Sequence, residues 1–129
     1  MKVLIVDDSK VVRDRLVSML SELEDIEVVG QAVDAFSAID AIPSLNPDVV
    51  ILDIYMSGSA TGMYVLDRIR REPNPPIVIM LTNYSYEQYR KRLLDAGAAF
   101  FFDKSTEFER IPEVLKHLLS KIRPFPDRD

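Results

Sequence analysis

Short apolar runs alternate with amphipathic segments along the whole chain. The runs cover residues 3–6, 49–52, 77–81 and 99–102, and a less regular run covers residues 26–32. Runs of this length between turn residues predict β-strands, and an unbroken apolar run predicts a strand buried on both faces of a parallel sheet. The run Val49-Val50-Ile51-Leu52 has Asn46-Pro47-Asp48 before it and ends in Asp53, so it predicts a central strand with a carboxylate at its carboxyl end.

The segments between these runs have apolar residues at helical spacing. They cover residues 9–23, 34–42, 63–72, 86–95 and 112–122. Asp34 is expected to cap the second helix, Pro43 to end it, and Gly97 to close the fourth helix with a left-handed backbone. Residues 105–110 are expected to form a turn or a short helical prelude to the last helix. Strict strand-helix alternation predicts an α/β fold, a doubly wound five-stranded parallel sheet with helices on both faces.

Composition narrows the classes of protein. The chain has 129 residues, 47% of them hydrophobic, which predicts one domain, placed at residues 1–122 with 123–129 as a C-terminal tail or the start of a linker. It has no cysteine and no apolar stretch approaching the length of a membrane span, so we expect a cytoplasmic protein with no membrane partner. A net charge of -5 argues against nucleic-acid binding through this domain.

Polar side chains stand at the carboxyl ends of four predicted strands. They are Asp7 and Asp8, Asp53, Thr82 and Lys104. Each alone has an ordinary structural explanation, such as helix capping or solvation. Because the carboxyl ends of parallel strands meet at one edge of a sheet, all of them are expected to lie together, at the edge where open α/β sheets bind ligands.

This grouping indicates phosphoryl-transfer chemistry. Three carboxylates at close range repel one another and require a counter-cation, and an all-oxygen donor set favours Mg²⁺ over zinc. Asp53 is the candidate nucleophile, which would form an acyl phosphate. Lys104 and Thr82 would hold phosphoryl oxygens by charge and by hydrogen bond.

The chain resembles the receiver domains of bacterial two-component response regulators, of the chemotaxis-regulator type, from Met1 to about Lys121. The matching motifs are Val6-Asp7-Asp8-Ser9, Pro47-Asp48, Ile51-Leu52-Asp53-Ile54 with Met56, Leu81-Thr82, Ala96-Gly97-Ala98 and Phe101-Phe102-Asp103-Lys104. The resemblance implies a flavodoxin-like strand order, 2-1-3-4-5. It implies that Asp53 is the phosphoacceptor, that Thr82 and Lys104 contact the phosphoryl group, and that Thr82 and Phe101 are switch residues. The metal ligands it implies are Asp7, Asp8, Asp53 and the backbone carbonyl of Tyr55.

The resemblance also implies partners. They are a sensor histidine kinase or phosphotransfer protein as donor, and an output protein or a covalently linked effector domain as receiver of the signal. Phosphorylation would change the face made by the fourth helix, the fifth strand and the fifth helix, where Tyr86, Arg90 and His117 could meet a partner or a second copy. The chain would catalyse its own phosphorylation and slow dephosphorylation but act mainly as a switch.

Several positions depart from the usual pattern of this family. Ser57 replaces a proline, and Gly62 comes one residue late, so that loop is longer. Ser105 replaces a proline that usually follows a cis bond, and a cis bond before another residue would cost about 3 kcal/mol. Asn83 is larger than the usual small residue. Phe101 replaces the commoner tyrosine, so its inward state makes no hydroxyl hydrogen bond.

Other aromatic and basic residues add weaker signals. His117, the one histidine, is expected to be a surface residue, and Arg90-Lys91-Arg92 a solvated basic run. Tyr84, Tyr86 and Tyr89 are expected to pack or to face a partner. By the resemblance, Tyr55 and Tyr84 flank the path of water to the acyl phosphate, and their bulk predicts slow self-dephosphorylation.

Three other functions are alternatives for this sequence. A nucleotide-binding Rossmann domain is disfavoured because no Gly-x-Gly-x-x-Gly follows a strand. A magnesium phosphatase of the aspartyl-phosphate type would need an acid two residues after the nucleophile, where Tyr55 stands. The third alternative is a degenerate receiver used only for protein contacts, without phosphorylation.

Overall fold

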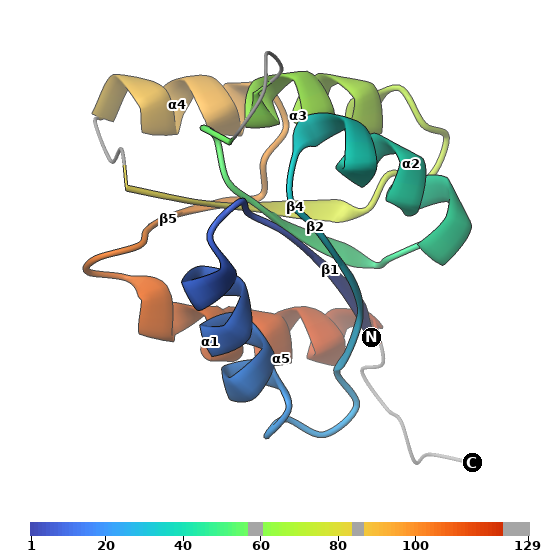
Figure 1. Cartoon of the computed structure of the whole chain (residues 1–129), viewed down its shortest axis with the longest axis vertical. Coiled ribbons are helices and arrows are strands. Elements are labelled where there is room, and N and C mark those ends of the chain that lie inside the picture. The colour runs from blue at the N-terminus through green and yellow to red at the C-terminus, as the bar shows by residue number, and fades with distance from the viewer. Residues whose placement is uncertain (57–60, 84–86, 123–129) are drawn as a thin grey trace.

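Strands and helices alternate along the chain, as its pattern predicts (Figure 1). The structure, a computed structural model, describes residues 1–56, 61–83 and 87–122. The strands are β1 Lys2–Val6, β2 Glu27–Ala32, β3 Val49–Leu52, β4 Ile77–Thr82 and β5 Phe100–Asp103. The helices are α1 Lys10–Leu20, α2 Ala35–Leu45, α3 Gly62–Arg70, α4 Glu87–Asp95 and α5 Ile111–Ile122, with a short 3₁₀ helix, η1 Phe108–Arg110, before α5.

The strands form one parallel sheet in the order β2-β1-β3-β4-β5. The predicted fold class and strand order are therefore confirmed. β1 and β3 pair from Val3 opposite Val49 to Val6 opposite Leu52, and β4 and β5 end with Thr82 opposite Asp103. This register aligns the carboxyl ends of neighbouring strands, so the residues that follow them share one edge of the sheet.

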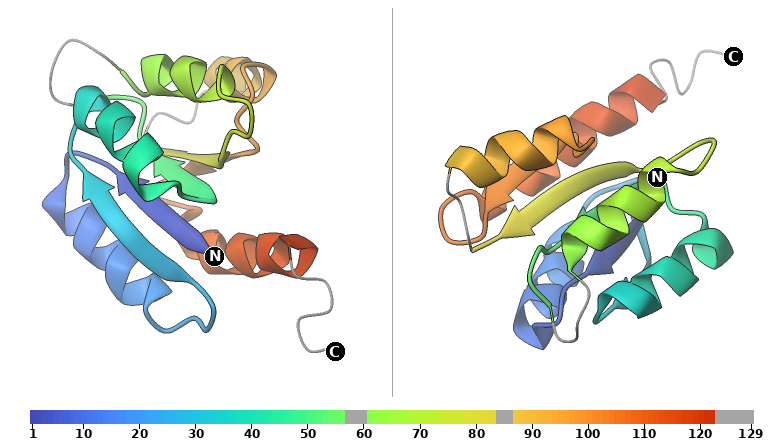
Figure 2. Two further views of the ribbon diagram at one scale, coloured as in Figure 1. Left: turned by 90° about the vertical axis from the view of Figure 1, so that its right-hand side faces the viewer. Right: turned by 90° about the horizontal axis from the view of Figure 1, so that it is seen from above.

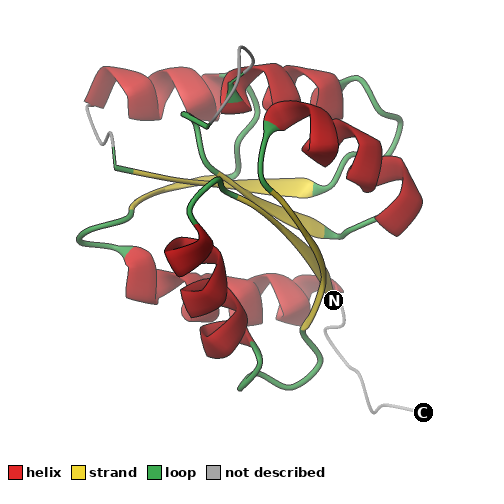
Figure 3. Ribbon diagram, in the orientation of Figure 1, coloured by secondary structure: helices red, strands yellow, loops and turns green. Residues whose placement is uncertain are grey.

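Helices cover both faces of the sheet (Figures 1 and 3). Leu4 and Val6 of β1 point into a cluster with residues of α2, α3 and α4, including Leu66. Val3 and Ile5 point the other way, into a cluster with Leu16 of α1 and residues of α5. The two faces of one strand thus contribute to two cores, as the unbroken apolar runs predict. Figure 2 shows the same layers from two further directions.

Burial distinguishes the central strand from the edge strand. All four residues of β3 are buried, whereas β2 has mostly intermediate or exposed residues. The apolar run of β3 and the mixed run of β2 indicated this difference in the sequence. No described helix is long and apolar enough to cross a membrane.

Three helix ends differ from the prediction, and one of them is that α3 was expected to reach residue 72 but ends at Arg70. α1 was expected to reach residue 23 but ends at Leu20, where the Leu23 amide donates three residues back to the Leu20 carbonyl at 3.1 Å and so leaves the α-helical hydrogen-bond pattern. Pro43 does not end α2, which continues to Leu45. A proline in the last turn costs a hydrogen bond, but Asn46 adopts a left-handed conformation (φ 48) and its amide donates to the Ile42 carbonyl at 2.8 Å.

Other predicted helix ends are confirmed. Asp34 caps α2, and its side chain accepts from the Ser37 amide at 2.8 Å. Gly97, just after α4, has a φ of +111, where a side chain would be strained. η1 is the short prelude expected before α5, which includes Pro112 in its first turn.

Candidate functional site at the carboxyl edge of the sheet

Buried polar side chains gather where the strands end. Among the described residues the buried polar or charged side chains are Asp7, Asp53, Thr82 and Asp103. They follow or end β1, β3, β4 and β5. Thr82 is fully buried, and its carbonyl accepts from the Lys104 amide at 2.8 Å. The structure thus brings together the residues that the sequence placed at this edge.

Lys104 is the centre of the cluster. Its ammonium lies 2.7 Å from Oδ2 of Asp7 and 3.0 Å from Oδ2 of Asp53. The three side chains are 10%, 3% and 7% exposed. Charges this well removed from water require close, oriented partners, because an unpaired buried charge is costly. The Asp7 and Asp53 carboxylates therefore share one cation, the Lys104 ammonium.

Backbone amides fix the other carboxylate oxygens. Oδ1 of Asp7 accepts from the Ser9 amide at 2.8 Å, and Oδ1 of Asp53 accepts from the Ile54 amide at 2.8 Å. The Ser9 side chain also caps α1 by accepting from the Val12 amide, so the Asp7 and Ser9 side chains both hold the turn between β1 and α1. Because each carboxylate is held on both oxygens, the site is oriented before any ligand binds.

The protonation of Asp53 depends on its burial. Burial raises the pKa of the Asp53 carboxyl to about 6, since Lys104 only partly offsets the loss of water and the Asp7 charge raises the pKa further. Burial alone would lower the pKa of Lys104, but its hydrogen bonds to Asp7 and Asp53 outweigh this and raise that pKa above its usual value. Lys104 therefore stays charged, and the cluster has more negative than positive charge.

Three carboxylates are close enough to hold a metal ion. Asp7, Asp8 and Asp53 each offer one oxygen, and these atoms lie within 4.8 Å of one another. Asp7 and Asp53 are buried and Asp8 is exposed. All the donors are carboxylate oxygens, which hard divalent cations prefer, and a single ammonium leaves the group short of positive charge. The residues thus fit a metal ion.

The backbone at Gly62, the first residue of α3, packs closely against the backbone of Asp53 and Ile54. The Gly62 amide donates to the Ile54 carbonyl at 2.7 Å, and a Cβ at Gly62 would lie 2.0 Å from the Asp53 carbonyl oxygen. A glycine is therefore required here, although it comes one residue late compared with the family pattern. Ser57 lies outside the described residues. Tyr55 is 43% exposed.

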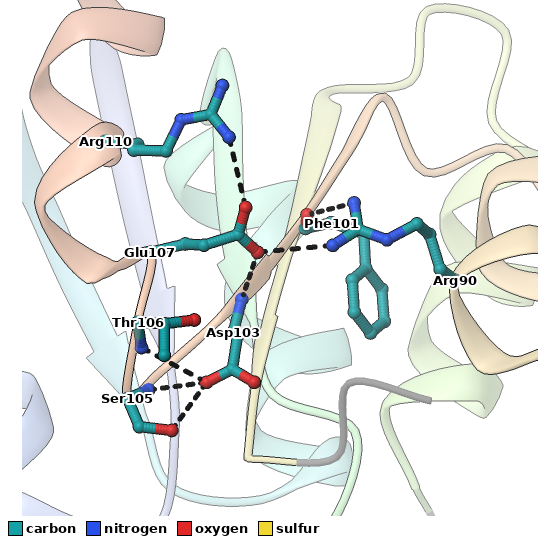
Figure 4. A network of polar contacts seen from close by, with 7 residues as sticks. All are labelled: Arg90, Phe101, Asp103, Ser105, Thr106, Glu107 and Arg110. Carbon is teal, nitrogen blue, oxygen red and sulfur yellow. Dashed lines mark hydrogen bonds and ion pairs between the residues drawn. The ribbon is translucent and has the colours of Figure 1, made fainter. Parts of the chain in front are cut away.

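A network of hydrogen bonds holds the turn after β5, which we call the Lys104 turn (residues 103–107; Figure 4). Oδ1 of Asp103 accepts from the Ser105 amide at 2.7 Å, the Ser105 hydroxyl at 2.6 Å and the Thr106 amide at 3.3 Å. Oε1 of Glu107 accepts from the Asp103 amide at 3.0 Å. No cis peptide bond occurs in the described parts of the chain, so the bond between Lys104 and Ser105 is trans.

Arg90 connects α4 to this turn, which the sequence did not indicate. It was expected on a solvated basic run, but its guanidinium donates to the Phe101 carbonyl at 3.0 Å and to Oε1 of Glu107 at 3.2 Å. The same guanidinium lies 4.9 Å from the centre of the Phe101 ring. Its neighbour Lys91 does follow the expectation, since it is exposed and pairs with Asp95 on α4.

Phe101 is already inside the protein. It is 2% exposed and packs in the core beneath α3 and α4. The inward position that the resemblance associates with the phosphorylated state is thus the position in this structure. His117 is exposed on α5, as expected. Tyr84 and Tyr86 lie outside the described residues, so their expected roles stay predictions.

Known proteins with these features were found by sequence and by structure. A family model for the response regulator receiver domain matches residues 3–116. The chain is 40% identical over 105 residues to a protein-glutamate methylesterase/protein-glutamine glutaminase of Alkalilimnicola ehrlichii, with 80% of this chain and 26% of that protein covered. It is 31% identical over 116 residues to the sensory transduction protein LytT of Bacillus cereus, with 90% and 46% covered.

A solved structure of the same family is also similar to this chain. The response regulator domain of Thermotoga maritima CheB superposes with a TM-score of 0.77 at 32% identity, and the match covers 100% of this chain and 98% of that one. The chain spans 26% to 46% of the length of the two curated relatives. From the family match over residues 3–116, the shared strand order and the acidic edge with Lys104, we conclude that the chain belongs to the response regulator receiver domain family.

Proposed function

We propose that this protein is a phosphorylation-dependent signalling switch whose phosphoacceptor is Asp53. The observation that supports this best is the position of Asp53: a buried carboxylate at the carboxyl end of the central strand, 3.0 Å from the Lys104 ammonium. Burying a carboxylate beside a cation usually adds little to the stability of the fold, because both charges lose their water. The same arrangement places a positive charge where a phosphoryl group bound to Asp53 would need it.

The reaction transfers a phosphoryl group from a histidine kinase or a phosphotransfer protein. A carboxylate oxygen of Asp53 forms a bond to phosphorus, the bond from phosphorus to the donor imidazole nitrogen breaks, and that nitrogen keeps the electron pair. Lys104 neutralises charge on the phosphoryl oxygens, and the Thr82 hydroxyl donates a hydrogen bond to one of them. Both residues lie at the same edge of the sheet as Asp53: Thr82 ends β4, the neighbour of β3, and Lys104 follows β5.

The metal ion we propose for this site is Mg²⁺. Asp7, Asp8 and Asp53 would hold it, together with the backbone carbonyl of Tyr55. Bound Mg²⁺ supplies positive charge that offsets the repulsion between the incoming phosphoryl group and the carboxylates. By the resemblance to receiver domains, we infer that Asp8 is the direct ligand and that Asp7 acts through water.

The signal leaves through the face made by α4, β5 and α5. Its partner would be an output protein, an effector domain in the same polypeptide, or a second copy of this chain. Residues 1–122 would form the receiver unit and 123–129 a tail or the start of a linker. A net charge of -5 argues against direct nucleic-acid binding by this domain, and the lack of cysteine favours a cytoplasmic protein.

Acetyl phosphate tests the proposal. The full chain is incubated with this donor and Mg²⁺, and intact mass is measured for the parent and for Asp53→Asn. A gain of about 80 Da in the parent, absent in the variant, supports phosphorylation of Asp53. No gain in the parent would favour a degenerate receiver that acts only through protein contacts. An equal gain in both proteins would place the phosphoryl group elsewhere.

A further inference from the structure

The Lys104 turn has no proline to fix its shape. Lys104 must place its ammonium between Asp7 and Asp53, which are both buried. The next residue is Ser105, and the bond between them is trans. The turn therefore needs another source of order, because a displacement of about 1 Å at a reacting centre can cost a factor of about 100 in rate.

Glu107 supplies much of that order. Its amide donates to the Asp103 carbonyl at 2.8 Å, and its carboxylate accepts from the Asp103 amide at 3.0 Å. These reciprocal bonds close the chain around Lys104. Figure 4 shows the Glu107 carboxylate between the turn and two arginines: Arg90 at 3.2 Å on one oxygen and Arg110 at 3.0 Å on the other.

The surroundings of Glu107 favour its charged form. Burial raises the pKa of its carboxyl, but the hydrogen bonds from the Asp103 amide and from Arg90 outweigh that and lower the pKa below its usual value. The Glu107 side chain is 21% exposed, against 87% for Glu109 in η1. Two acids of one type therefore stand close together in the chain, and only one of them is built into the turn.

Arg90 connects this turn to α4. Its guanidinium bonds both Glu107 and the carbonyl of Phe101, and it lies over the Phe101 ring. Phe101 and Asp103 are two residues apart on β5. A movement of α4 would thus reach β5 directly at the Phe101 carbonyl, and it would reach the turn on both sides of Lys104 through the Glu107 carboxylate, which also bonds the Asp103 amide.

We propose that Glu107 is a positioning residue: its carboxylate fixes the turn that holds Lys104 against Asp53 and connects that turn to α4 through Arg90. The proposal rests on the proposed phosphorylation of Asp53. Glu107 itself does not touch the reacting atoms. It acts on the reaction only through Lys104.

A double-variant experiment separates this role from a general loss of stability. The rate of phosphorylation by acetyl phosphate with Mg²⁺ is measured for the full chain, for Glu107→Ala, for Lys104→Ala and for both changes together. Glu107→Ala should slow the reaction about tenfold. In the Lys104→Ala background the same change should have no further effect, because there is no ammonium left to position. A parental rate in Glu107→Ala, or an equal slowing in both backgrounds, overturns the proposal.

Two further variants sharpen the result. Glu109→Ala is the matched control, since Glu109 is exposed and its nearest partner, Arg15, lies at 3.8 Å; its rate should equal that of the parent. Glu107→Gln keeps an oxygen that can accept from the Asp103 amide, so it should stay close to the parental rate. If Glu107→Gln is as slow as Glu107→Ala, the hydrogen bond to the turn is not what positions Lys104.

A second measurement does not depend on phosphorylation. Hydrogen exchange of the Asp103 and Thr106 amides is followed in the parent and in Glu107→Ala without metal or donor. Loss of the carboxylate should speed exchange at both amides, and unchanged protection contradicts the proposal. If the parent takes up no phosphoryl group at all, the proposed function fails, and this exchange measurement still decides whether Glu107 orders the turn.

Discussion

Two aspartates flank the same strand and do different work. Asp48 precedes β3 and Asp53 follows it. Asp48 is exposed, and its carboxylate accepts from the Lys2 amide at 2.7 Å, which joins the start of β1 to the start of β3. Asp53 is buried, and its carboxylate lies beside the Lys104 ammonium and the carboxylates of Asp7 and Asp8.

The two aspartates differ in their exposure to water and in the charges around them. At the amino end, a carboxylate satisfies a backbone donor and stays in water, so its charge costs little. At the carboxyl end, the charge is withdrawn from water and placed among like charges, which raises the pKa of Asp53 to about 6. The presence of an aspartate therefore does not indicate a functional site. Burial of an aspartate beside other charges does indicate one, because that arrangement lowers the stability of the fold and is typical of functional sites.

The largest expected effect concerns phosphorylation itself. Asp53→Asn should abolish it, whereas Asp48→Asn, at the other end of the same strand, should leave its rate unchanged. Intact mass after incubation with acetyl phosphate and Mg²⁺ measures both. A slowed reaction in Asp48→Asn would mean that the two ends of β3 are less independent than their surroundings suggest.

A pair of glycines tests how tightly the chain is packed around Asp53. Gly62→Ala would place a Cβ 2.0 Å from the backbone oxygen of Asp53, which cannot move aside, and should lower the free energy of unfolding by about 3 kcal/mol. Gly30→Ala meets the end of the flexible Leu45 side chain at 2.6 Å and should cost less than about 1 kcal/mol. Urea denaturation of both variants makes the comparison. Equal losses would show that the approach to Asp53 is not the tighter one.

The stability of the metal-free protein should depend on pH through Asp53. Its folded pKa of about 6 lies above the ordinary value of 3.8, so folding favours the protonated form. The resulting cost is absent well below 3.8, grows as the pH rises toward 6, and is constant above that range. Asp53→Asn removes the charge and should raise the free energy of unfolding by about 2 kcal/mol near pH 7.5 and by less than about half of that near pH 4.5.

Denaturation of the parent and of Asp53→Asn in a chelator, at both pH values, measures this gain. Asp48→Asn serves as the control and should show no such pH-dependent gain. A gain of the same size at both pH values would mean that it does not come from the Asp53 charge.

Metal affinity should separate the two neighbouring acids after β1. Asp8→Ala should weaken Mg²⁺ binding about tenfold more than Asp7→Ala, because a direct ligand contributes more than one that acts through water. Titration of each variant with Mg²⁺ is the measurement. Affinities equal to that of the parent in both variants would assign these carboxylates to another task.

The smallest effect is on the lifetime of the phosphorylated form. Tyr55 is 43% exposed two residues after Asp53, where its bulk should hinder attack by water. Tyr55→Asn should therefore speed the decay a few-fold. Tyr64→Asn on α3, with a similar exposure of 41%, is the matched control and should leave the decay rate unchanged. The shielding idea is wrong if the Tyr55 variant decays no faster than the parent.

The fold, and the grouping of the polar residues at one edge of the sheet, could be predicted from the sequence. Strand and helix periodicity is local, so the five strands, their burial and the alternation with helices could be predicted from the apolar pattern. Asp7, Asp53, Thr82 and Lys104 could be grouped because parallel strands end at one edge. Pro43 misled the prediction of a helix end because the cap that lets α2 continue, Asn46, depends on a left-handed conformation.

Which of these side chains are in contact depends on how the chain packs in three dimensions. Lys104 and Asp53 are 51 positions apart, and the sequence contains no measure of the distance between their atoms. Arg90 and Glu107 looked like ordinary surface charges, since nothing local distinguishes them from Lys91 and Glu109. Their roles arise from packing, which brings α4, β5 and η1 together, so that the Glu107 carboxylate accepts from Arg90, the Asp103 amide and Arg110.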